Sequence, residues 1–193
     1  YNYSVYEAKN TDIILNYLIN ERQLDQDVVQ YLLDNEFMLQ DTANRAVMLW
    51  RDSGTKDGKI IGSNRQGTVT DFSKWERGTK KKVDWGSDNK NWGFNITLGT
   101  PKKLIFFEAF IDLLSYWSLN KDLNDCRLVA MEGTGKKIVE SFIQETYSRY
   151  GTLPTEGLYY GTDNDAVGQS FYDYMRYRFG DKQTNDGEEI KNI

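Results

Sequence analysis

The sequence predicts an α/β protein in two parts, a small α+β domain over residues 1–100 and a parallel sheet flanked by helices over residues 101–193. Two observations lead to this prediction. From residue 101 onward, short apolar runs alternate with amphipathic helical stretches, which is the order typical of a Rossmann-like parallel sheet with right-handed crossovers. Before residue 101, a pair of helical stretches precedes short apolar runs that are separated by turn residues, which is typical of an antiparallel β-meander.

The C-terminal part is expected to contain three strands and three helices in strict alternation. The run 103–107 is too short for a helix and rich in strand-forming residues, and helical apolar spacing begins directly after it. We expect the following elements at 109–119, 126–131, 135–149, 157–162 and 166–178. The single cysteine, Cys126, opens the second strand, where we expect a buried and unreactive thiol.

Acidic residues follow two of the predicted strands. Glu108 ends the first strand, Asp112 lies four residues later, and Asp163 and Asp165 follow the third strand. Because ligands bind at the carboxyl edge of such sheets, we expect Glu108, Asp163 and Asp165 to converge there. Carboxylates without a basic neighbour repel one another, and a hard divalent cation, Mg²⁺ or Mn²⁺, is the usual remedy. The alternative is that these acids simply cap the helices that follow them.

These motifs resemble the Toprim domain of DnaG-type bacterial primases, type IA topoisomerases and related nucleases. The stretch Glu108-Ala-Phe-Ile-Asp112 is similar to the E-G-x-x-D motif of the primases, with Ala in place of the usual Gly. The stretch Asp163-Asn-Asp165-Ala-Val-Gly168 is similar to their D-x-D motif, which a Gly follows three residues on. Residues 127–134 resemble the intervening strand that runs into Gly-Thr. This resemblance covers the sequence from residue 101 to its end.

The resemblance implies a Mg²⁺-dependent nucleotidyltransferase that makes short primers from nucleoside triphosphates on a single-stranded template. It implies that Asp163 and Asp165 hold the metal, that Glu108 is a metal ligand or a general base, and that Asp112 supports them. Two alternatives remain open: a Toprim nuclease that hydrolyses phosphodiesters, and a nucleic-acid-binding module without turnover. A topoisomerase is disfavoured, because nothing marks its separate catalytic tyrosine domain.

Two further features bear on the resemblance. The segment 11–98 resembles, more loosely, a domain that precedes Toprim in plasmid mobilisation and primase-like proteins, so we expect a role in DNA replication or plasmid transfer in a mobile element. Toprim primases also carry an additional acidic motif after the D-x-D helix. No predicted strand leads to the tail acids, so we expect this motif beyond residue 193. The tail acids are Asp186, Glu188 and Glu189.

A polar segment over residues 63–93 interleaves basic residues with tryptophans. Basic side chains contact phosphates and aromatic faces stack on unpaired bases, so we expect this segment to bind single-stranded DNA or RNA. The alternative is a solvated loop whose tryptophans pack back onto the meander. The expected contact residues are Lys74, Trp75, Arg77, Lys80, Lys81, Lys82, Trp85 and Trp92.

A second basic feature follows the strand 126–131. The stretch Gly133-Thr-Gly-Lys-Lys137 precedes a predicted helix, whose N-terminus could hold an anion. The spacing does not match a Walker A loop. We therefore expect phosphate contact by Lys136 or Lys137, with ordinary surface lysines as the alternative.

Composition excludes several classes of function. The 193 residues contain no histidine, which excludes His-based acid–base catalysis, Ser-His-Asp triads and His-ligated zinc within this chain. One cysteine excludes an internal disulfide and a cysteine zinc cluster, and a lone thiol fits a cytoplasmic location. The net charge of −5 gives no global basic field. No signal-peptide pattern or membrane-spanning run is present, so no membrane partner is expected. Because the sequence starts at Tyr1, we expect a piece of a longer multidomain protein.

Overall fold

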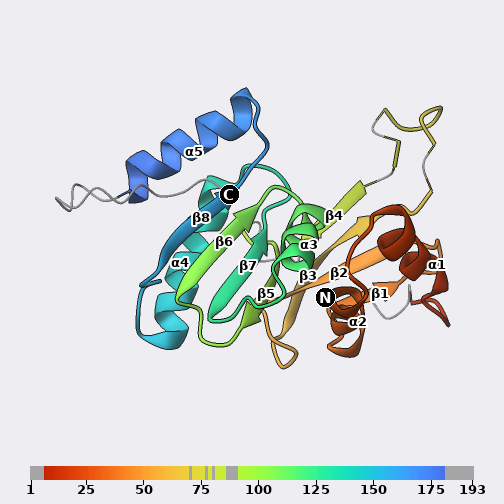
Figure 1. Ribbon diagram of the computed structural model, residues 1–193, viewed down its shortest axis with the longest axis horizontal. Helices are drawn as coiled ribbons and strands as arrows, with labels where there is room; N and C mark the ends of the chain where they lie inside the picture. The colour runs from red at the N-terminus through yellow and green to blue at the C-terminus, as the bar shows by residue number, and fades with distance from the viewer. Residues whose placement is uncertain (1–6, 70, 77, 80, 86–90, 181–193) are drawn as a thin grey trace. The chain divides into compact units, whose positions relative to one another are not determined.

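The computed structural model divides the chain into two compact units. It describes residues 7–69, 71–76, 78–79, 81–85 and 91–180 (Figure 1). The first unit comprises Tyr1–Lys90 and Leu114–Lys121, and the second comprises Asn91–Leu113 and Asp122–Ile193. The segment 91–100, which the sequence analysis assigned to the N-terminal domain, falls in the second unit because its strand pairs there. None of the helices in the described ranges combines the length and the apolar character needed to cross a membrane.

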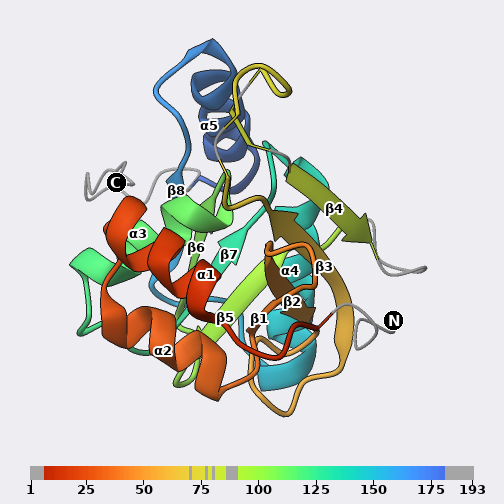
Figure 2. The ribbon, with the colours of Figure 1, turned by 90° about the vertical axis from the view of Figure 1, so that its right-hand side faces the viewer.

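The first unit contains short helices and an antiparallel sheet. Its helical elements are α1 (Asp12–Leu15), the π-helix η2 (Asn16–Glu21) and α2 (Gln26–Asp34). Its strands are β1 (Met38–Gln40), β2 (Ala46–Arg51), β3 (Ile60–Gln66) and β4 (Lys81–Trp85). The strands follow one another in space in the order β1-β2-β3-β4, and each neighbouring pair is antiparallel. The predicted helix pair and meander are therefore confirmed (Figure 2).

This sheet extends further than the sequence analysis predicted. Residues 63–93 were expected to be a polar loop, but β3 runs on to Gln66 and a fourth strand begins at Lys81. The polar end of β3 is buried, and Asn64 accepts a hydrogen bond of 2.8 Å from the Trp50 indole N–H. Polar residues can occupy a buried strand when their side chains are hydrogen-bonded, which hides the strand from a hydrophobicity pattern.

The second unit is built on a mixed sheet. Its strands are β5 (Phe94–Leu98), β6 (Lys103–Phe107), β7 (Cys126–Ala130) and β8 (Gly157–Gly161). Its helices are α3 (Phe110–Leu119), of which the last part belongs to the first unit, α4 (Lys136–Tyr150) and α5 (Ala166–Phe179). The strand order is β5-β7-β6-β8, and β6 is parallel to both of its neighbours. The predicted α/β class and alternation are confirmed, with an unpredicted antiparallel strand, β5, beside β7.

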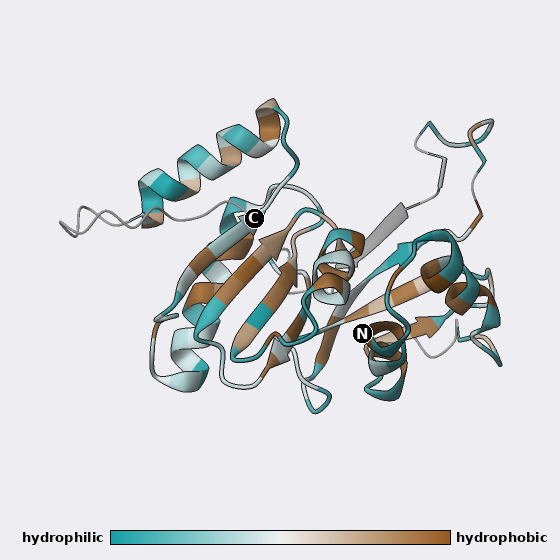
Figure 3. Cartoon of the chain, in the orientation of Figure 1, coloured by the Kyte–Doolittle hydropathy of each residue, from teal (hydrophilic) through white to brown (hydrophobic). Residues whose placement is uncertain are grey.

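The central strands β6 and β7 are buried along almost their whole length, and Figure 3 shows that most of their residues are hydrophobic. On one face, Phe106 of β6 lies edge-to-face against Phe142 of α4, with ring centroids 6.3 Å apart. A strand that is covered by helices on both faces of its sheet has an apolar residue at nearly every position, because both sets of side chains are buried. The run 104–107 shows this pattern. Cys126 is fully buried at the start of β7, and burial raises the pKa of its thiol to about 11, which confirms a packing role.

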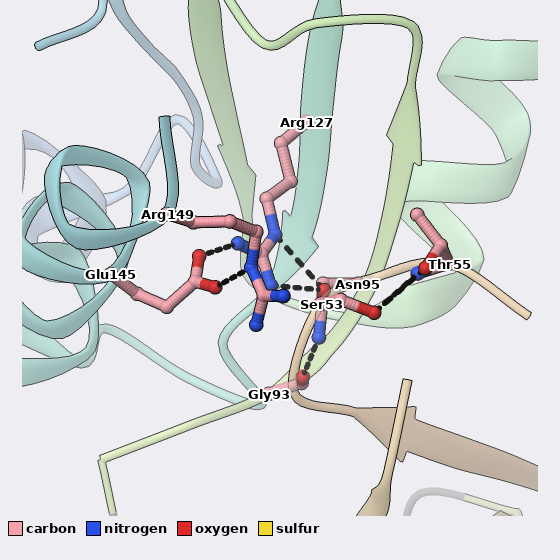
Figure 4. A network of polar contacts seen from close by, with 7 residues as sticks. All are labelled: Ser53, Thr55, Gly93, Asn95, Arg127, Glu145 and Arg149. Carbon is pink, nitrogen blue, oxygen red and sulfur yellow. Dashed lines mark hydrogen bonds and ion pairs between the residues drawn. The ribbon is translucent and has the colours of Figure 1, made fainter. Parts of the chain in front are cut away.

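One charged side chain, Arg127 of β7, is enclosed completely by this core. Its guanidinium donates hydrogen bonds of 3.0 and 2.8 Å to the side-chain oxygen of Asn95 and pairs with the carboxylate of Glu145, which also pairs with Arg149 (Figure 4). It also lies 4.7 Å from the centroid of the Phe142 ring. A buried charge is tolerated when it is paired and hydrogen-bonded in this way.

Candidate functional site

The acidic residues that follow β6 and β8 meet at the carboxyl edge of the sheet. These strands are adjacent and parallel, with Phe107 paired to Gly161, so both end at the same level. Glu108 leaves β6 at this point, and its Oε1 accepts a hydrogen bond of 3.1 Å from the backbone amide of Asp163, 55 residues further along the chain. The side chain that ends one strand is thus bonded to the backbone that follows the other.

The acids at this edge influence one another electrostatically. Partial burial is the main cause that raises the pKa of Glu108, and the negative charges of Asp163, Asp165 and Asp112 raise it further. The hydrogen bond from the Asp163 amide acts in the opposite direction. In the described part of the chain, no lysine or arginine forms an ion pair with Glu108, Asp163 or Asp165. The repulsion is therefore not relieved by a basic side chain there.

Two of the four acids also stabilise helix starts. Asp165 caps α5, since its Oδ1 accepts hydrogen bonds of 2.9 and 2.8 Å from the amides of Val167 and Gly168. Asp112 accepts a hydrogen bond of 3.1 Å from the amide of Ala109 at the start of α3. The capping alternative is therefore correct for these two residues, although capping with one oxygen leaves the second oxygen of Asp165 as a further acceptor.

The glycine that follows the D-x-D motif, Gly168, is required by the close packing between α5 and the end of β8. A Cβ atom at this position would lie 1.9 Å from the carbonyl oxygen of Asp163, a distance that no side chain tolerates. The first turn of α5 can approach the end of β8 this closely only because Gly168 has no side chain.

We expect substitutions of Asp165 to separate its capping role from its charge. Asn is as good an N-cap as Asp, so Asp165→Asn should leave the thermal unfolding midpoint nearly unchanged, whereas Asp165→Ala should cost about 1 kcal/mol of stability. If the charge is needed for a metal, both variants should lose activity alike. Thermal melts and activity assays on the two proteins check this, and an active Asp165→Asn protein would reduce Asp165 to a cap.

The donor chemistry of this edge fits a hard divalent cation only in part. Glu108, Asp163 and Asp165 are carboxylates that form no ion pair with a lysine or arginine among the described residues, and carboxylate oxygens are the donors that Mg²⁺ and Mn²⁺ prefer. In those same ranges, however, no three Asp, Glu, His or Cys side chains are grouped so that they could hold a metal ion by themselves. Mg²⁺ is commonly held by one or two carboxylates together with waters and substrate phosphates, and Glu108 and Asp163 could supply such a pair.

The residues expected to bind nucleic acid do not form one loop. Lys74 is exposed and forms an ion pair of 3.0 Å with Asp71, and Trp75 is half-buried. Trp92 is buried and stacks on Phe142 with ring centroids 4.3 Å apart, so its ring packs in the core of the second unit and offers no exposed face to a base. Lys81, Lys82 and Trp85 lie on β4, and Arg77 and Lys80 are outside the described residues.

The two lysines expected to contact phosphate are exposed at the start of α4. The Lys136 ammonium lies 3.8 Å from the centroid of the Tyr174 ring on α5, a cation–π contact that the sequence analysis missed. Lys137 extends from the next position of the same helix turn. The tail acids Asp186, Glu188 and Glu189 lie outside the described residues.

A hollow that the sequence analysis did not predict lies beside the acidic edge. Its volume is about 310 Å³, and it is formed by the end of β8 and the first turns of α5. It is lined by Tyr160, Thr162, Asp163, Asn164, Gly168, Gln169 and Tyr172. Asp163 thus belongs both to the acidic edge and to this pocket. The clustering of polar residues around the D-x-D motif was the available sequence signal.

Comparison with known families defines the class of the second unit. Residues 105–188 match the family model described as Toprim-like, and residues 16–88 match a family of unknown function, DUF3991. The segment 105–188 is therefore a Toprim-like domain, as its motifs and its fold indicated. The two matches follow one another along the chain, in the order that the looser resemblance of the segment 11–98 implied.

One protein resembles the chain in sequence, and two solved structures resemble it in fold. An uncharacterized protein of Bacillus anthracis, pXO2-78, is 35% identical over 192 residues, which cover 97% of this chain and 54% of that protein. The chain thus spans about half the length of that relative.

Among solved structures, the primase fragment of the bacteriophage T7 primase-helicase protein aligns with a TM-score of 0.48 and 14% identity, over 80% of this chain and 57% of that one. The DnaG primase catalytic domain bound to single-stranded DNA aligns with a TM-score of 0.43 and 14% identity, over 92% and 74%. These likenesses are too distant to carry any property of those proteins over to this chain.

Proposed function

We propose that this chain supports divalent-metal-dependent nucleotidyl transfer of the primase type, with nucleoside triphosphates as substrates and single-stranded DNA or RNA as template. The observation that carries the proposal is the juxtaposition of Glu108 and Asp163 at one sheet edge, where their charges interact without a basic partner among the described residues. The Toprim-like match over residues 105–188 supports the same chemistry.

The chain's own residues would act by position and charge. Glu108 and Asp163 would hold a Mg²⁺ or Mn²⁺ ion together with waters and substrate phosphates, while Asp165 caps α5 and adds negative charge to this edge and Asp112 bonds the start of α3. Such an ion would clamp and neutralise the oxygens of a transferring phosphoryl group. Catalysis of phosphoryl transfer depends mainly on positioning the reactants and neutralising their charge, so it does not require a histidine as acid or base. Lys136 and Lys137 are the basic groups on a neighbouring helix start that could contact phosphate.

A second candidate function is supported by the same geometry. The described acids do not form a group of three that could hold a metal ion without further ligands. This observation favours a nucleic-acid-binding module that retained the Toprim-like fold and lost turnover. A Toprim nuclease would use the same acids as the transferase, so only an assay separates those two.

The test is a pair of assays on the whole chain. Primer synthesis is measured with labelled nucleoside triphosphates on single-stranded DNA and RNA in Mg²⁺, and strand cleavage is measured on the same strands in Mn²⁺. Primers without cleavage support the proposed transferase, and cleavage without primers supports the nuclease. If neither occurs while oligonucleotide binding changes the tryptophan fluorescence, the binding module is correct and the transferase is wrong.

A further inference from the structure

Tyr160 lines the pocket beside the acidic edge, and its buried hydroxyl has no hydrogen-bond partner among the described residues. Tyr160 is only 4% exposed. A hydroxyl that is buried without a hydrogen-bond partner lowers the stability of the fold, so such a group usually forms a hydrogen bond with a ligand or a water molecule. Burial raises the pKa of Tyr160 well above its usual value, so the hydroxyl remains protonated and can donate a hydrogen bond.

The rest of the lining offers aromatic surface and uncharged polar groups. The rings of Tyr160 and Tyr172 lie edge-to-face with centroids 6.4 Å apart. Gln169 donates its amide N–H to Asp173 at 2.9 Å, which fixes the side chain and leaves its carbonyl oxygen as an acceptor. Asn164 adds an exposed amide with both donors and an acceptor. The lining therefore combines flat apolar surface with hydrogen-bonding edges.

Charge and size restrict what can enter. The described lining contains no lysine or arginine, and its one charged side chain is the carboxylate of Asp163, so a phosphate would not be held inside. Small-molecule pockets begin at roughly 300 Å³. At about 310 Å³, this one lies at the small end of that range and has room for a nucleobase.

We propose that this pocket binds the base of a nucleoside triphosphate while the phosphates of the same molecule lie outside it, at the edge of Glu108 and Asp163. The base would stack on the half-buried ring of Tyr172, accept a hydrogen bond from the Tyr160 hydroxyl, and present its other polar atoms to Asn164 and Gln169. This inference deepens the proposed function and rests on it, because it identifies which part of the substrate the pocket takes.

The experiment measures equilibrium binding by calorimetry in Mg²⁺, using the whole chain with each of the four nucleoside triphosphates and with inorganic tripolyphosphate. We expect at least one nucleoside triphosphate to bind more tightly than tripolyphosphate. Tyr160→Phe, which keeps the ring, and Asn164→Ala with Gln169→Ala should each weaken that binding roughly three- to tenfold, because each removes neutral hydrogen bonds. Tripolyphosphate binding should not change. Gln144→Ala, an exposed glutamine on α4, is the matched control.

The outcomes separate this proposal from the proposed function. Equal affinity for tripolyphosphate and for all four nucleotides, absence of nucleotide binding, or pocket variants that bind nucleotides as well as the unmodified chain would each overturn the base pocket. Base-dependent binding without primer synthesis would uphold the pocket and overturn nucleotidyl transfer. Thermal melts of the variants show whether a loss of binding reflects unfolding.

Discussion

Replacing both central acids of the edge by their amides, in the double variant Glu108→Gln and Asp163→Asn, is expected to lower primer synthesis at least about 100-fold. Changing groups that merely orient metal ligands costs roughly 10- to 100-fold, so loss of two proposed ligands should cost no less. Both amides preserve the size of the side chains. Initial rates in Mg²⁺ measure the effect, and Asp122→Asn, an exposed acid elsewhere in the second unit, is the matched control.

The Glu108→Gln substitution by itself should not weaken the fold. The pKa of Glu108 is raised above its ordinary value of 4.5, so the folded state disfavours the ionised form. This residue therefore contributes stability that is present below its unfolded pKa and is lost as the pH rises through its folded pKa. Glu108→Gln removes that loss, so the variant should be at least as stable as the unmodified chain at neutral pH. A large drop in its melting temperature would show that Glu108 has a structural role instead.

Replacement of the buried Arg127 should have the largest effect on the free energy of unfolding. We expect Arg127→Met to destabilise the second unit by about 1–3 kcal/mol, because the buried side-chain oxygen of Asn95 would lose the hydrogen bonds from Arg127, while Glu145 would keep its pair with Arg149. Urea unfolding followed by circular dichroism measures the loss.

Arg149, the second arginine that pairs with the Glu145 carboxylate, provides the control. Arg149 also pairs with Glu145 but is exposed, so Arg149→Met should cost only about 0–1 kcal/mol. Similar losses for the two variants would contradict the distinction between a buried and a surface ion pair.

The alternation of elements from residue 103 onward could be predicted because its causes are local. Leu104 to Phe107 form an apolar run that only a covered strand would bury, and the helices that follow repeat their apolar residues with helical spacing. The convergence of Glu108 and Asp163 followed from topology alone, since parallel neighbouring strands end at one edge.

Side chains whose partners are distant in sequence could not be assigned in this way. Trp92 lies in a stretch rich in basic residues and was expected to stack on a base, but it packs on Phe142, 50 positions later in the sequence. The polar end of β3 likewise had no hydrophobic signature, because hydrogen bonds and not apolar contacts account for its burial.

The sequence by itself determined the order of strands and helices, the Toprim-like motifs and the edge at which the acids collect, because periodicity and strand direction are properties of neighbouring residues. The tertiary structure alone decided that β5 joins the second sheet antiparallel to β7, that Arg127 is enclosed with Asn95 and Glu145, and that Tyr160 lines a pocket beside Asp163. Each of these depends on which polar group meets which partner across the fold, and burial makes that choice energetically decisive.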